Sequence, residues 1–142
     1  MDPELFMQRW AGVDRCGQNA ADAWREFVEK VKASQIAGLE LAHFPSGVPY
    51  LYLSNSSIGA VSILRLASTT PFVKDLLYKP IWESDPKVRE ARQQFRDALM
   101  KVPGAAYGGG MGRVSVPVRA VAERHEAMLK AVSDLASALG VR

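Results

Sequence analysis

Hydrophobic and polar positions along this chain recur with two different periods, and the change between them predicts its elements. In residues 19–32 apolar side chains return every three or four positions, as on one face of a helix. In residues 39–53 they alternate with polar, small or aromatic positions on either side of the turn Pro45-Ser46-Gly47, which is typical of a β-hairpin. The pattern therefore predicts helices around a short antiparallel ribbon.

Capping residues predict where further helices begin. Asp2-Pro3-Glu4 starts one, and Asp85 followed by Pro86 starts another. The polar run 54–57 precedes many apolar positions, so residues 57–70 are interpreted as a buried central helix. The last apolar positions fall near a heptad seam and predict a long C-terminal helix.

These elements predict one domain of mainly α class, an antiparallel four-helix bundle with a small antiparallel β-hairpin or sheet at one end. The domain covers residues 1–142. Its expected parts are two helices in 1–37, the hairpin in 38–54, the central helix in 57–70, a helix and a mobile glycine-rich loop in 71–116, and the C-terminal helix in 117–140.

Composition excludes several classes of function. A net charge of +3 permits an acidic partner without requiring one. The single cysteine, Cys16, allows no internal disulfide and fits a reducing compartment. Neither histidine has a companion at metal-ligand spacing, and no nucleophile elbow is present. We therefore expect no catalytic residue, no metal and no cofactor. Without catalytic residues, the protein is expected not to be an enzyme. Its apolar runs are too short to span a membrane.

Basic residues gather in the second half of the chain. Arg89, Arg92 and Arg96 recur at helical spacing beside an apolar helix face, as in a ridge that contacts phosphates, although an ordinary solvated face fits the same pattern. Residues 103–113 are rich in glycine, and Arg113 follows them. No strand is predicted before this segment and no Gly-Lys-Ser/Thr follows it, so a loop ordered by a partner is favoured over a nucleotide-binding loop.

Several short motifs follow one another in the first half of the chain. A helix containing AWREFVEK leads to a strand ending at Phe44-Pro45, and the aromatic strand Tyr50-Leu51-Tyr52-Leu53 follows. Next come the apolar residues 60–66 and the turn Ser68-Thr69-Thr70. This order resembles the coat proteins of rod-shaped plant viruses, the tobacco mosaic virus type, in which a central helix ends at a Ser/Thr-rich turn. The likeness covers roughly residues 2–74.

The chain departs from the family at several positions. His43 stands where the family has an arginine, and of two family arginines beyond the central helix only Lys74 keeps a charge, because Phe72 replaces the other. The acidic start of the family's last helix is missing, and the segment before that helix is longer.

The resemblance implies a capsid protein that assembles helically around single-stranded RNA and holds phosphates without reading bases. Its partners would be copies of itself and single-stranded RNA, and it would be found in the virion and the host cytoplasm. RNA contacts would fall on Lys74, Arg89, Arg92, Arg96 and Arg113. Subunit contacts would fall on Trp10, Phe44, Tyr50 and Tyr52.

Two other hypotheses stay open. The first is a small helical adaptor that forms homo-oligomers through the seam of its C-terminal helix. The second is a small enzyme or nucleotide binder that uses the glycine-rich loop.

Overall fold

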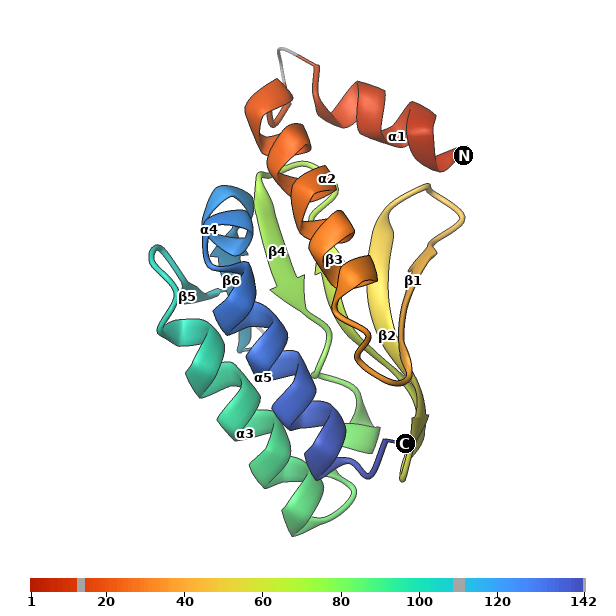
Figure 1. Ribbon diagram of the computed structural model, residues 1–142, viewed down its shortest axis with the longest axis vertical. Coiled ribbons are helices and arrows are strands. Elements are labelled where there is room, and N and C mark those ends of the chain that lie inside the picture. Colours follow the sequence, from red (N-terminus) through yellow and green to blue (C-terminus); the bar gives the residue numbers. More distant parts are fainter. Residues whose placement is uncertain (13–14, 109–111, 142) are drawn as a thin grey trace.

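The structure, a computed structural model, describes residues 1–12, 15–108 and 112–141. A six-stranded antiparallel sheet in the order β1-β2-β3-β4-β6-β5 forms one layer, and helices form the other (Figure 1). The helices are α1 (Pro3–Trp10), α2 (Gln18–Ala33), the 3-10 helix η1 (Pro80–Glu83), α3 (Pro86–Met100), α4 (Val118–Glu123) and α5 (His125–Ala138). The strands are β1 (Leu39–His43), β2 (Pro49–Ser56), β3 (Gly59–Leu66), β4 (Phe72–Asp75), β5 (Ala106–Gly108) and β6 (Arg113–Pro117).

The predicted mainly α four-helix bundle is wrong, because residues expected in its central helix form the middle of the sheet. Strand β3 occupies the region predicted as the helix 57–70. The run 54–57 does not cap a helix, since it ends β2 and turns the chain at Gly59, whose φ is +92°. There the Ser56 hydroxyl donates a hydrogen bond to the Gly59 carbonyl oxygen.

A β-bulge explains why the pattern of β3 indicated a helix. Leu64 pairs with Leu51, and Ser62 pairs with Tyr52, so Ile63 is the extra residue between them. Ile63 and Leu64 are both fully buried although they are neighbours in sequence. The bulge thereby breaks the period of two and leaves a nearly continuous apolar run, which periodicity alone does not distinguish from a buried helix.

The later segments also differ from the expected arrangement. Residues 71–116 were expected to form one helix and a loop, but β4, η1, α3, β5 and nearly all of β6 lie there. The long C-terminal helix is divided at Arg124, whose φ of −109° and ψ of 35° interrupt the α conformation between α4 and α5. Residues 109–111 of the glycine-rich segment lie outside the described residues.

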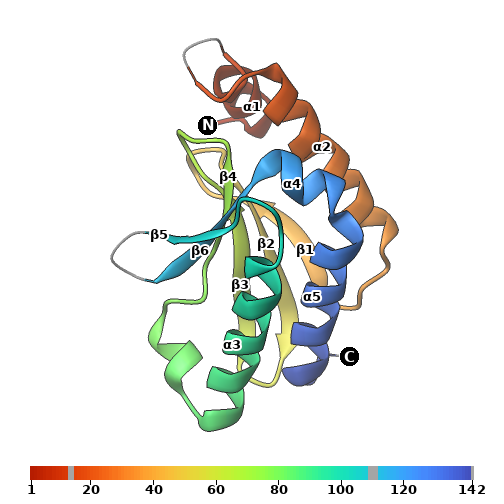
Figure 2. The same ribbon diagram turned by 90° about the vertical axis from the view of Figure 1, so that its left-hand side faces the viewer.

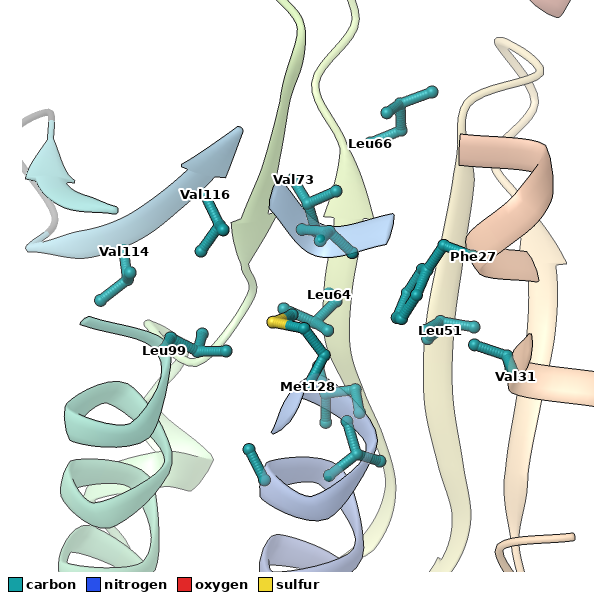
Figure 3. Packing of buried hydrophobic residues seen from close by; sticks show 14 of the residues in the cluster. Phe27, Val31, Leu51, Leu64, Leu66, Val73, Leu99, Val114, Val116 and Met128 are labelled. Atoms are coloured by element: carbon teal, nitrogen blue, oxygen red, sulfur yellow. The ribbon is translucent and has the colours of Figure 1, made fainter. Parts of the chain in front are cut away.

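One face of the sheet packs against the helices and forms the core. Figure 3 shows the sheet side chains meeting those of α2, α3 and α5. The labelled core residues are Phe27, Val31, Leu51, Leu64, Leu66, Val73, Leu99, Val114, Val116 and Met128. Because side chains alternate along a strand, the residues between them point to the opposite face.

Gly47 in the β1–β2 turn offers a test of this packing. It has a φ of +90°, and a Cβ placed there would lie 2.7 Å from the Cβ of Phe6 on α1. Gly59 has nearly the same φ of +92° but open space around that position. We expect Gly59→Ala to cost about 1–2 kcal/mol of unfolding free energy through backbone strain alone, and Gly47→Ala to cost more because α1 must also move. Urea unfolding of both variants measures the difference, and equal losses would contradict the contact with α1.

Candidate nucleic-acid interface

The second face of the sheet is open in the part of the chain that the structure describes. Figure 2 shows α2, α4 and α5 on one side of the sheet, with β5 and β6 extending toward the other side. Strand residues on the open face are half-buried rather than enclosed, as the alternation of exposure along β2 shows. The side chains on this open face are therefore accessible to a ligand.

Strand register places one row of these residues across all six strands. Each pairs directly with the next in the order Ala42, Tyr50, Arg65, Lys74, Ser115 and Ala106. They alternate with the buried residues Leu51, Leu64 and Val73, so all belong to the open face. The row thus places the aromatic Tyr50 directly beside the cations Arg65 and Lys74.

The aromatic end consists of Phe44, Tyr50 and Tyr52. The Phe44 and Tyr50 rings are stacked, with centroids 4.3 Å apart and planes 30° from parallel. The Tyr50 and Tyr52 rings are tilted, with centroids 6.0 Å apart. The neighbouring Glu40 carboxylate and, to a smaller extent, burial raise the pKa of Tyr52. These rings form a partly exposed platform on which another flat group can stack.

Beside the aromatic end lies a hollow of about 200 Å³, which we call the basic hollow. It is lined by Arg65, Ala67, Ser68, Thr69, Thr70, Lys74 and Arg113. The three cations come from β3, β4 and β6, and three hydroxyl residues come from the loop between β3 and β4. No carboxylate is present among the described residues of the lining. The basic hollow therefore offers donors and positive charge without an internal counter-charge.

Electrostatics within the basic hollow favour an anion. Burial lowers the pKa of Arg65, and the nearby Arg113 cation lowers it further. Both causes disfavour the charged form of Arg65, and a bound anion would offset both. Arg65 also connects the two parts of the face, because its Cζ lies 5.2 Å from the Phe44 ring centroid. On the other side, the Cζ of Arg113 lies 4.8 Å from the Tyr78 ring centroid, which holds that side chain over the open face.

The structure divides the residues predicted to contact RNA. Lys74 and Arg113 both line the basic hollow. Arg96 lies on α3 instead, is only 8% exposed, and forms an ion pair with buried Asp75. Arg92 donates to the Glu83 carboxylate and to the Leu77 carbonyl oxygen. Arg89 on the same helix is exposed. The three arginines thus do not form one ridge of available charges.

The residues predicted at subunit contacts are divided in the same way. Phe44, Tyr50 and Tyr52 form the aromatic end of the open face. Trp10 is 1% exposed and lies inside this chain, where its indole Nε1 donates to the Ala67 carbonyl oxygen at 2.8 Å. That bond anchors the start of the loop that lines the basic hollow.

Sequence reasoning missed Arg65 and the loop hydroxyls as site residues. Residues 57–70 were expected to form a buried central helix, so Arg65 was not expected in a row of strand residues. A signal for its role was present, because Arg65 lies between Leu64 and Leu66 in the alternating pattern of a strand. The bulge at Ile63 concealed that alternation.

A larger hollow, of about 460 Å³, lies near the start of α2 and includes Cys16, Asn19 and Arg119. Burial raises the pKa of the Cys16 thiol, while Arg15 acts in the opposite direction with a smaller effect. A raised pKa leaves less of the nucleophilic thiolate. Within residues 1–12, 15–108 and 112–141, no group of three or more His, Cys, Asp or Glu side chains is arranged to hold a metal ion. Arg119 is the charged residue among the described lining of this larger hollow, which thus lacks the convergent charge of the basic hollow.

Comparison with known proteins identifies no relative, so the evidence for function is the geometry of the open face. No model of a protein family, no curated protein and no solved structure matches this chain. Among the described helices, none has the length and apolar character needed to cross a bilayer.

Proposed function

We propose that this protein binds single-stranded nucleic acid across the open face of its sheet. The observation that supports this proposal is the open face itself, on which the stacked rings of Phe44 and Tyr50 adjoin the three cations of the basic hollow, with no carboxylate among its described lining residues. Single-stranded nucleic acids are bound by this combination, because aromatic rings stack on bases and cations neutralise the backbone. RNA is the ligand that the coat-protein resemblance implies.

The dimensions of the row fit a short length of strand. Neighbouring β-strands are about 4.8 Å apart, so Tyr50 on β2 and Ser115 on β6 are separated by about 14 Å along the row. A few nucleotides can lie over that distance with bases at the aromatic end and phosphates at the basic hollow. A duplex fits less well, since its base faces are stacked on each other and cannot reach the rings.

Helical self-assembly and a virion location remain predictions of the resemblance. The radial four-helix bundle that the family would use is not formed here, so that assembly geometry is not proposed again. We also do not propose an oligomer through the C-terminal seam. Val121, Val132 and Leu135 of that seam are at most 2% exposed and belong to the core of this chain.

Binding of labelled single-stranded RNA and DNA dodecamers, measured by fluorescence anisotropy, tests the proposal. Arg65→Gln and Arg89→Gln remove the same charge, one from the open face and one from α3. We expect Arg65→Gln to weaken binding and to reduce the slope of log affinity against log salt by about 0.7, while Arg89→Gln changes neither. Tyr50→Ala should remove about 1–3 kcal/mol of binding free energy through lost stacking.

Folding of each variant is checked by near-ultraviolet circular dichroism before binding is compared. Equal losses from Arg65→Gln and Arg89→Gln would contradict the proposed face, as would a duplex that binds as tightly as the single strand. A complete lack of oligonucleotide binding at low salt would contradict the function itself.

A further inference from the structure

The basic hollow contains more donors than an internal phosphate requires. Its lining supplies three cationic side chains and three hydroxyl side chains. An internal phosphodiester carries one negative charge and two oxygens that are not bonded to sugars. A terminal phosphate carries about 1.5–2 negative charges at pH 7 and three acceptor oxygens. The donor set of the basic hollow therefore matches a terminal phosphate better.

The loop that carries the hydroxyl groups is held in place by bonds within the chain. The Ala67 amide donates to the Phe72 carbonyl oxygen at 2.8 Å, and the Phe72 amide donates to the Thr70 carbonyl oxygen at 2.8 Å. The Trp10 indole donates to the Ala67 carbonyl oxygen at 2.8 Å. A loop fixed before the ligand arrives loses less conformational entropy on binding.

Arg65 connects the basic hollow to the aromatic end, and so would direct a bound nucleic-acid strand from the hollow toward the rings. It lines the hollow and also lies against the Phe44 ring, which is stacked on Tyr50. A nucleotide whose phosphate sits beside Arg65 thus has its base next to the aromatic end. The loop residues Ser68, Thr69 and Thr70 line the same hollow.

We infer that the basic hollow binds the terminal phosphate of a single strand and that the nucleotides beside it lie on the aromatic end. This inference rests on the proposed function and specifies its ligand as a strand carrying a phosphate monoester at one end. A terminal phosphate carries more negative charge and one more acceptor oxygen than an internal phosphate, so the three cations of the hollow should prefer such an end measurably.

Three octanucleotides of one sequence test the inference: one with a 5′-phosphate, one with a 3′-phosphate, and one with hydroxyl groups at both ends. Each is unlabelled and competes with the same fluorescent dodecamer for the full chain. We expect one phosphorylated form to bind roughly tenfold more tightly than the form with hydroxyl ends. The comparison between the 5′ and 3′ forms identifies the end that is recognised.

The hydroxyl groups are tested with Thr69→Val and Thr70→Val combined, a change that keeps the side-chain shape. This double variant should lose most of the preference for the phosphorylated end, measured as the ratio of its affinities for the phosphorylated octanucleotide and the octanucleotide with hydroxyl ends. Ser137→Ala on α5 removes a hydroxyl group far from the lining residues and should keep the preference.

Each outcome separates the inference from the function it rests on. If no octanucleotide competes, the proposed function fails. If all three bind equally, nucleic-acid binding stands and the terminal-phosphate site is overturned. If a phosphoserine peptide competes as strongly as the phosphorylated octanucleotide, the hollow recognises phosphate monoesters outside nucleic acid, and the inference is overturned as well.

Discussion

Replacing Asp75 by alanine is expected to lower the free energy of unfolding by about 3–5 kcal/mol, because it leaves the buried charge of Arg96 without its partner. Asp75 is fully buried on β4, and Arg96 on α3 is 8% exposed. The Nε of Arg96 donates to Asp75 at 3.1 Å and its Nη2 donates at 3.0 Å. Removing one partner of a buried ion pair costs stability because the remaining charge stays buried without a partner.

Asp75 also joins elements that are distant in the sequence. Its carboxylate accepts from the backbone amides of Val114 on β6 at 2.7 Å and of Leu77 at 2.9 Å. Alanine leaves both amides without this acceptor, in addition to the arginine. Because Val114 follows Arg113, the same change should disturb one cation of the basic hollow.

Urea unfolding of Asp75→Ala, Asp75→Asn and Glu83→Ala measures the effect. Asparagine keeps an acceptor oxygen but not the charge, so its loss should be intermediate. Glu83→Ala breaks the pair with Arg92, but the Glu83 side chain is 53% exposed, and we expect a loss below about 1 kcal/mol. A loss from Asp75→Ala no larger than that from Glu83→Ala would contradict the structural role of the buried pair.

Replacing Trp10 by alanine is expected to cost about 3–5 kcal/mol of unfolding free energy, the range found for large aromatic residues removed from a core. Trp10 is 1% exposed and attaches α1 to the end of β3 through its bond to the Ala67 carbonyl oxygen. Phenylalanine retains much of the packing but leaves that buried oxygen without the indole donor, at a cost of about 1–3 kcal/mol.

Trp10→Phe also connects the fold to the proposed site. Once the Ala67 carbonyl is released, the hydroxyl groups of the following loop are less well fixed, so the preference for a phosphorylated end should fall. Thermal unfolding gives the stability of this variant, and competition with the octanucleotides gives the preference. A variant with unchanged stability and unchanged preference would show that the indole bond does not position the loop.

Local signals in the sequence account for the starts of two helices. Asp2 was expected to cap the first, and its carboxylate accepts from the amides of Glu4 at 2.9 Å and Leu5 at 3.1 Å. Asp85 was expected to cap another, and it accepts from the Val88 amide at 2.9 Å. Such caps are formed by residues within a few positions of each other, so no distant contact is needed to predict them.

The candidate site was only partly accessible to the same reasoning. Lys74, Arg113 and the aromatic residues were selected through a resemblance, and the structure brings them to one face. Arg96 was selected because its spacing suggested an exposed helical ridge. Spacing along a helix shows which residues share a face. It does not show that Arg96 forms an ion pair with Asp75, which lies on a strand 21 residues away in the sequence.

By itself, the sequence determined the features that depend on neighbouring residues: the hairpin around Gly47, the amphipathic helix α2 and the helix caps. The tertiary structure alone decided that residues 59–66 extend as β3 and that Tyr50, Arg65 and Lys74 lie side by side. The physical reason is that an apolar run gains similar burial as a strand or as a helix. Pairing with β2 and β4, and the bulge that buries both Ile63 and Leu64, select the strand.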